Sequence, residues 1–345
     1  MTFSFFTLLL INVSLFVLAV IGNIGKRFWK QILFVQILII VIVFGLRDDK
    51  VGIDTWAYIL HYNSGTGGYF KEPAFKYLGF FLHKIIKESA IYILVISLLT
   101  GSFAYFGIKK LSIRKEIIPL IAWVFLSNTM VIFSWVNGVR QGIASMIILN
   151  SVMLLSVQRK KSAGLCLILA PMFHFSSLVF IGQQVIYKLG KRIKLFRIIN
   201  SDHYIIDILC LFLAYLLGLL ASKIPYLSDK YANMGSKILL IKIALSVFFY
   251  FITKYILYIG DYSSAKRIFD TYFFIICLSI FFLFNTEVSN RFLYYGGIFE
   301  SLILGFVLSK AKKNKIPYLL MLILGNSFYY ILTIATSAYA NMFNM

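Results

Sequence analysis

Residues 44–58, FGLRDDKVGIDTWAY, place four charged side chains directly after a long apolar run. These side chains are Arg47, Asp48, Asp49 and Asp54. A guanidinium group binds phosphate oxygens through paired hydrogen bonds, and a carboxylate can take the proton of an attacking hydroxyl. The stretch therefore predicts a site for a phosphate-bearing ligand, with a base nearby, at the end of a membrane helix.

Three other segments carry polar residues of the same kinds. They are Arg140 and Gln141 in SWVNGVRQGIA, His174 in FHFSSLVF, and Arg291 in NTEVSNRFLYYGG. Guanidinium is permanently charged, so three arginines at one membrane surface fit a lipid diphosphate. A histidine or carboxylate beside them would activate a sugar hydroxyl.

Each residue also has a structural interpretation. An arginine at a helix end can snorkel toward the membrane surface. Asp48 and Asp49 can be solvated charges that pair with Lys50, and Asp54 can cap a helix that begins after it. His174 by itself can be a structural histidine. These alternatives stay open for each residue taken singly, whereas the set as a whole is more specific.

The elements that must position these residues are membrane helices. Of the 345 residues 60% are hydrophobic and 14% charged, whereas soluble domains carry about 25% charged residues. Apolar runs long enough to cross a bilayer recur along the chain. We predict one all-α polytopic domain, residues 1–345, with about ten transmembrane helices. The predicted spans are 3–22, 29–46, 90–108, 117–135, 139–157, 203–222, 237–258, 268–285, 292–309 and 316–336.

Two apolar segments do not fit simple spans. Residues 73–88 alternate an apolar and a basic stripe at helical spacing, which predicts an interfacial amphipathic helix within an external loop, 47–89. Residues 163–187 are interrupted in the middle by Pro171, His174 and two serines. We predict that this segment is a re-entrant hairpin with His174 near its tip.

The net charge of +21 does not indicate nucleic-acid binding, because the basic residues lie in short loops between apolar runs. Such residues orient membrane helices and meet anionic lipid. A cytoplasmic loop at 23–30, together with the hairpin, places most of the 34 lysines and arginines inside. We therefore predict a multi-pass membrane protein with both termini and the polar site outside. The three cysteines lie in apolar segments without paired spacing, which predicts no disulfide or metal framework.

Five segments, in order, resemble the EpsG family within the Wzy-type polysaccharide polymerases. FGLRDDKVGIDTWAY is similar to its R-D…G-T-D-x-x-x-Y stretch, with Ile53 where threonine is commoner. EPAFKYLGFFL resembles its E-P-x-F segment, VNGVRQGIASMIIL its N-x-x-R-Q-x-(I/L)-A helix start, and FHFSSLVF its H-x-S-(A/S)-L hairpin. NRFLYY resembles its R-x-x-x-Y end. The resemblance covers roughly residues 25 to 300.

This resemblance implies a GT-C-like fold and a reaction on the outer face of the bacterial cytoplasmic (inner) membrane. A growing glycan moves from undecaprenyl diphosphate to a hydroxyl of the next lipid-linked repeat unit. Arg47, Arg140 and Arg291 would hold the diphosphate and stabilise its charge, and either Asp54 or His174 would be the base. The residues expected to orient the substrate are Asp48, Asp49, Gln141, Tyr58 and Tyr294. The resemblance implies no cofactor, and partners limited to lipid-linked glycans, membrane lipids and a chain-length regulator, without nucleic acid.

Other functions remain open from the sequence. A flippase for the same lipid-linked unit would also place arginine and aspartate in a cavity, but it needs a site reachable from both sides. A ligase that moves finished glycan to another acceptor shares almost all of the chemistry. An acyltransferase would need a partner for His174. A metal-dependent GT-C enzyme would use Asp48, Asp49 and Asp54 as oxygen ligands for a divalent metal.

Overall fold

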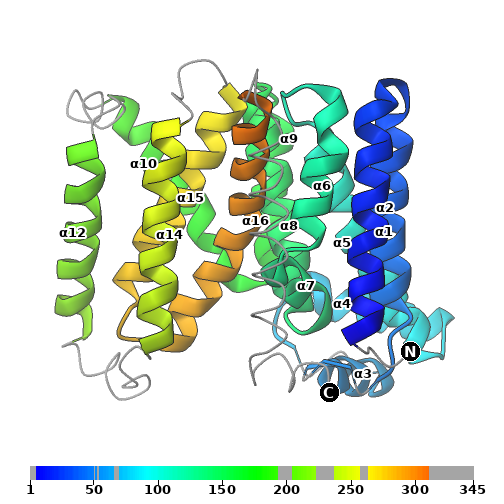
Figure 1. Cartoon of the computed structure of the whole chain (residues 1–345). Coiled ribbons are helices and arrows are strands. Elements are labelled where there is room, and N and C mark those ends of the chain that lie inside the picture. The colour runs from blue at the N-terminus through cyan, green and yellow to red at the C-terminus, as the bar shows by residue number, and fades with distance from the viewer. Residues whose placement is uncertain are drawn as a thin grey trace. The chain divides into compact units, whose positions relative to one another are not determined.

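The structure is a computed structural model of the chain and describes residues 5–49, 51–52, 54–65, 70–192, 204–222, 237–256 and 263–310. Every regular element within these ranges is a helix (Figure 1). Four helices are long and apolar enough to cross a membrane: Lys26–Gly45, Ser89–Lys109, Val139–Ser156 and Tyr204–Ser222. The predicted all-helical membrane fold is confirmed for these ranges, whereas ten spans and a GT-C-like arrangement stay predictions.

The chain forms two compact units, which are described separately. Unit 1 comprises Met1–Leu178 and Leu304–Met345, and unit 2 comprises Val179–Ile303. The helices of unit 1 are α1 (Phe5–Ile24), α2 (Trp29–Gly45), α3 (Thr55–Asn63), α4 (Pro73–Ile85), α5 (Ser89–Lys109), α6 (Ile118–Leu126), α7 (Thr129–Val136), α8 (Val139–Ser156) and α9 (Lys160–Phe173). Short 3₁₀ turns, η1 (Lys26–Phe28), η2 (Lys115–Ile117) and η3 (Phe175–Leu178), precede α2 and α6 and follow α9.

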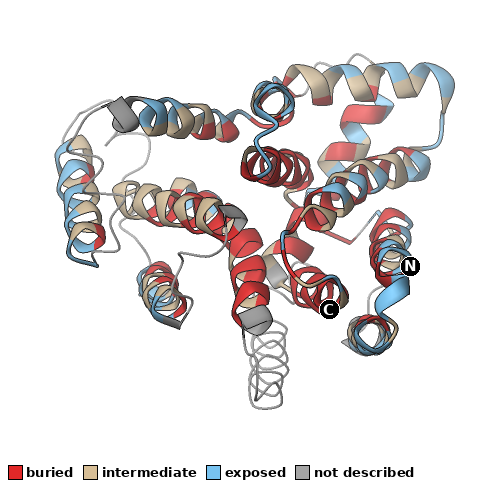
Figure 2. Ribbon diagram, turned by 90° about the horizontal axis from the view of Figure 1, so that it is seen from above, coloured by how far each residue is buried: buried red, intermediate tan, exposed pale blue. Residues whose placement is uncertain are grey.

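Helix α8 is the core of unit 1. Nearly all of its residues are buried, because α5, α7 and α9 pack around it. Helix α2 packs on α5, and α1 packs on α2 and α6. The burial colours of Figure 2 show helices that are red on most sides beside others that are pale along their outer side. Helix α8 is therefore covered by other helices on nearly all sides, as a central helix of a bundle is.

The predicted span 117–135 is bent in the structure, and its course as one crossing of the membrane stays a prediction. It consists of η2 with α6 and then α7, bent by 66° at a short break. The Asn128 side chain accepts a hydrogen bond of 2.9 Å from the main-chain N–H of Met130. An asparagine at this position satisfies a free N–H at the start of a new helix, so the polar pair Ser127–Asn128 ends α6 and begins α7.

The two unusual segments have the local structure that their residues favour. Helix α4 occupies most of 73–88 and begins at Pro73, where the missing N–H of proline costs no hydrogen bond. Its Phe75 is buried whereas Ile85 is exposed. The segment 163–187 breaks at His174, between α9 and η3. An interfacial position for α4 and a re-entrant course for 163–187 stay predictions, and the predicted span 316–336 lies outside the described residues.

Unit 2 contains α10 (Val179–Arg192), α12 (Tyr204–Ser222), α14 (Lys237–Ile256), α15 (Ser263–Phe281) and α16 (Thr286–Lys310), the last turns of which belong to unit 1. Helices α12 and α14 both pack on α15. Two acidic side chains are held between these helices.

The first of these two side chains is Asp207 on α12, which accepts hydrogen bonds from Lys254 (2.5 Å) and Tyr250 (3.3 Å) on α14. The second is Glu300 on α16, which accepts from Tyr272 (2.6 Å) and Ser246 (3.1 Å). An acid within a span is costly unless it is paired, so these contacts account for both side chains structurally.

We expect Lys254→Met to lower the free energy of unfolding by about 3–5 kcal/mol, because it leaves the buried Asp207 carboxylate without its cation. A double variant, Asp207→Leu with Lys254→Met, should lose less than half as much. Thermal unfolding of the purified protein in detergent measures both. A double variant as unstable as the single one would contradict this explanation.

Candidate functional site

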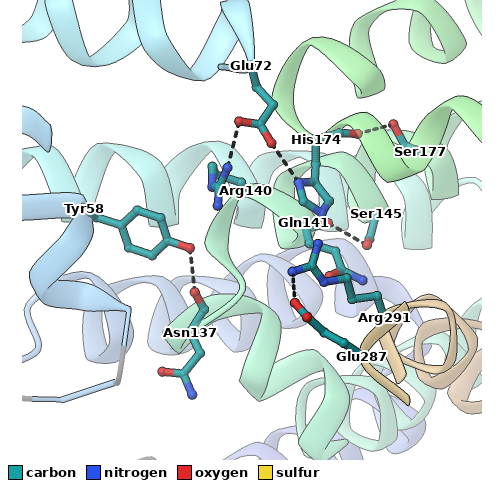
Figure 3. A network of polar contacts seen from close by, with 10 residues as sticks. All are labelled: Tyr58, Glu72, Asn137, Arg140, Gln141, Ser145, His174, Ser177, Glu287 and Arg291. Carbon is teal, nitrogen blue, oxygen red and sulfur yellow. Dashed lines mark hydrogen bonds and ion pairs between the residues drawn. The ribbon is translucent and has the colours of Figure 1, made fainter. Parts of the chain in front are cut away.

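Glu72, the residue before α4, is the centre of a charged cluster in unit 1 (Figure 3). Its Oε2 accepts a hydrogen bond of 2.7 Å from Nη1 of Arg140, and its Oε1 lies 3.1 Å from Nδ1 of His174. Only 5% of Glu72 is exposed. The carboxylate therefore joins the start of α4, the start of α8 and the end of α9.

The charge of Glu72 is stabilised by these neighbours. Burial opposes its ionisation, but the hydrogen bond with His174 and the charge of Arg140 outweigh burial and lower the pKa of Glu72 to about 2. The carboxyl group is therefore ionised at neutral pH and can only accept hydrogen bonds.

Arg140 lies where an anion would be stabilised. It is the second residue of α8, and the positive end of a helix dipole and its free N–H groups favour negative charge there. Its guanidinium carbon lies 4.2 Å from the centre of the Phe70 ring. Its Nε–H is buried and has no hydrogen-bond acceptor. An arginine held on one edge by a carboxylate, with a donor left over, can bind a phosphate oxygen.

The turn between α7 and α8, which presents Arg140, is held by the loop after α2. Nη2 of Arg47 donates to the main-chain oxygen of Val136 (3.2 Å), and the Tyr58 hydroxyl donates to that of Asn137 (2.6 Å). Gly52 has φ +94°, and a Cβ there would lie 2.8 Å from Oδ1 of Asn137. The charged stretch after α2 thus packs directly against the turn.

Arg47 and Tyr58 are both buried, and their expected direct contact with substrate stays a prediction. Arg47 is 7% exposed, and it also donates to the main-chain oxygen of Phe44 (2.6 Å) and to Thr55 (3.3 Å). Burial lowers the pKa of Arg47 to about 10, so it stays protonated. Burial also raises the pKa of Tyr58 to about 12. Three of the five N–H donors of Arg47 and the hydroxyl of Tyr58 bind protein atoms, so both side chains position the turn.

Close packing of α7 on α8 depends on Gly142. A Cβ at this residue would lie 2.2 Å from the main-chain oxygen of Ser134. Main-chain atoms cannot move aside as a flexible side chain can, so only glycine fits this crossing. Gly142 is two residues after Arg140, and its contact therefore sets the direction in which the first turn of α8 begins.

His174 is held by the break that follows α9. Its main chain is extended, with φ −158° and ψ 117°, and its carbonyl oxygen accepts from the N–H (3.1 Å) and the hydroxyl (2.9 Å) of Ser177. A serine three residues on is a local turn signal. The H-x-S-S pattern therefore builds the turn that directs the imidazole toward Glu72.

The other predicted site residues lie in several environments. Asp49 and Asp54 are exposed and Asp48 is partly buried, all in the loop between α2 and α3. Asp54 has the N-cap position of α3 as expected, but its side chain makes no cap hydrogen bond. Gln141 is buried in the first turn of α8.

Arg291 and Tyr294 lie on α16 in unit 2. Arg291 pairs with Glu287 one turn earlier, and its side chain is 45% exposed. Convergence of Arg291 with Arg140 stays a prediction.

Glu72 is the site residue that the sequence reasoning missed. The signal was present in EPAF, where an acid directly precedes a proline at a helix start. Nothing local indicated its partners, which lie 68 and 102 residues later in the chain. Within the described ranges, no group of three or more histidine, cysteine or acidic side chains is placed to hold a metal ion. The absence of a metal from the reaction stays a prediction.

Residues 30–345 match the family model of the EpsG family, which covers most of the chain. The chain belongs to the EpsG family. This is a family of Wzy-type polysaccharide polymerases, so the predicted resemblance is confirmed. Membership and the apolar helices together identify a membrane protein of polysaccharide biosynthesis, in a family associated with glycosyltransferase-like polymerase activity. Comparison with curated proteins and with solved structures gave no match.

In this EpsG-family protein, Gly142→Ala should lower the free energy of unfolding by about 1–3 kcal/mol or more, because the added methyl group overpacks against main chain. Gly164→Ala is the matched control. It lies inside α9 with no heavy atom within 4 Å of the new Cβ, so it should be neutral or stabilising by up to about 1 kcal/mol. Thermal unfolding in detergent compares the two, and equal stability of both variants would contradict the packing argument.

The stability contributed by ionised Glu72 should depend on pH in a defined direction. Its folded pKa of about 2 lies below the ordinary value of 4.5. The contribution is therefore complete above pH 4.5 and is lost as the pH falls toward 2. The difference in unfolding free energy between the parent protein and Glu72→Gln should shrink across this window. Unfolding curves collected between pH 2 and 7 measure it, and a difference that is constant with pH would contradict the ionised state.

Proposed function

We propose that this protein polymerises lipid-linked oligosaccharide repeat units at the outer face of the bacterial cytoplasmic membrane. The growing glycan would leave undecaprenyl diphosphate and join a hydroxyl of the next lipid-linked unit. The observation that carries this proposal is the cluster of Glu72, Arg140 and His174. It places a cation suited to phosphate beside a group able to take a proton, in a chain of the EpsG family.

Arg140 is the proposed ligand of the donor diphosphate. Its buried Nε–H and the first turn of α8 would donate to phosphate oxygens, and the charge that develops as the glycosidic bond breaks would be stabilised there. Arg291 is proposed as a second phosphate ligand, from the family motif. Arg47 is proposed to act indirectly, by holding the turn that presents Arg140.

The acceptor hydroxyl needs a base, for which Asp54 and His174 are the candidates. The exposed Asp49 and Asp54, with Asp48, Gln141 and Tyr294, are proposed to orient sugar hydroxyls. Departure of the lipid diphosphate supplies the driving force, so neither a nucleotide nor a metal is required. Membrane lipids and a separate chain-length regulator are the proposed partners.

We expect purified protein to convert the lipid-diphosphate-linked repeat unit into a ladder of longer glycans, with or without EDTA. The substrate can be isolated from a strain that lacks this polymerase. Arg140→Ala should slow ladder formation by about 10²–10³-fold, the usual effect of removing one charge-stabilising donor. Arg140→Lys should be intermediate, because a lysine keeps the charge and loses the paired donors. The rate is read from product bands on a gel.

Arg159→Ala is the control, since this arginine is exposed at the start of α9, and its rate should be that of the parent. A ladder lost with EDTA would turn the three aspartates into candidate metal ligands. If the folded parent protein makes no ladder from its own substrate, the polymerase proposal fails and a flippase or ligase is favoured. A normal ladder from folded Arg140→Ala would remove Arg140 from the proposed site.

A further inference from the structure

The two carboxylate oxygens of Glu72 contact two different side chains, the proposed phosphate ligand Arg140 and the candidate base His174. One oxygen accepts from the guanidinium of Arg140 at 2.7 Å, and the other lies 3.1 Å from the imidazole of His174. The side chains of Glu72 and His174 are about one-tenth exposed or less. Because an ionised carboxylate has no proton to give, Nδ1 of His174 must be the donor. In the neutral imidazole, a proton on Nδ1 leaves the lone pair on Nε2, which is then the basic nitrogen.

The surroundings of Asp54 and His174 distinguish these two candidate bases. Asp54 is exposed at the start of α3, and its side chain makes no cap hydrogen bond there. His174 is held from both sides, by Glu72 at its ring and by Ser177 at its carbonyl oxygen. A general base must be oriented toward the proton that it removes. Glu72 is placed to orient His174 in this way.

We propose that His174 is the general base of the polymerase and that Glu72 is its positioning residue. Glu72 would hold the imidazole close to Arg140, the proposed diphosphate ligand. This inference rests on the proposed function. The acceptor hydroxyl oxygen forms a bond to the anomeric carbon of the donor glycan, and the bond from that carbon to the diphosphate oxygen breaks. The lipid diphosphate leaves with the electron pair. The hydroxyl proton moves to Nε2 of His174, and Glu72 stays ionised beside the imidazolium.

The contact between Glu72 and Arg140 also leads to an expectation about donor binding. The carboxylate competes with the donor diphosphate for the same guanidinium, so its removal should leave donor binding unchanged or tighter. Its loss from His174 should slow the chemical step. Glu72→Gln should therefore lower kcat by about 10²–10⁴-fold, the range of general-base catalysis, without raising KM for the donor.

A double-variant cycle tests whether Glu72 acts through His174. The rates of Glu72→Gln, His174→Asn and the double variant are measured with the lipid-diphosphate-linked repeat unit. If Glu72 acts through the imidazole, the double variant should be no more than about threefold slower than His174→Asn. A merely structural role of Glu72 would instead slow both backgrounds by the same factor. Glu88→Gln, an exposed acid at the start of α5, is the control and should retain the parent rate.

Three results would overturn the inference: parent kcat in folded Glu72→Gln, equal slowing in both backgrounds, or loss of donor binding as the main effect. If Glu72→Gln does not fold, Glu72→Asp decides, because it keeps the charge but is one methylene too short to reach both partners. It should lower kcat, and a parent kcat would overturn the inference. Activity of the parent protein separates the outcomes, since an inactive parent contradicts the proposed function and an active one isolates the role of Glu72.

Discussion

The candidate site depends on the contacts of the ionised Glu72 carboxylate with Arg140 and His174. A buried charge is tolerated only when neighbours satisfy it, and here a guanidinium and an imidazole do so from two other segments. Arg140 and His174 stabilise the ionised form of Glu72. In turn, the fold must keep both groups near the carboxylate, because a buried charge without partners is costly. The start of α4, the start of α8 and the end of α9 therefore form one site.

Several polar side chains hold the turn between α7 and α8, which presents Arg140. Arg47 and Tyr58 donate to the main-chain oxygens of Val136 and Asn137, and Gly142 lets α8 lie against α7. A main-chain oxygen in a buried turn needs a donor, and long side chains from the loop after α2 provide it. The family's charged motif after α2 thus includes residues that support the site as well as exposed acids that can face a glycan.

Unit 2 contains acidic side chains whose contacts give them a structural role. Asp207 and Glu300 are satisfied by lysine, tyrosine and serine side chains of neighbouring helices. These contacts join α12 to α14 and α16 to α14 and α15. Such acids are typical of structural pairs in a low-dielectric interior. The cluster around Glu72 differs because one carboxylate contacts both a guanidinium and an imidazole.

The sequence by itself determined the helical membrane class, the approximate bounds of most described helices and the family. Hydropathy is a local property and the five motifs occur in order, so neither needs the fold. It also singled out Arg140 and His174. Only the tertiary structure decided that Glu72 joins them, that Arg47 and Tyr58 are buried supports, and that residues 117–135 form two helices. The partners of a buried charge depend on which distant segments meet, and Glu72 lies 68 and 102 residues from the groups that stabilise it.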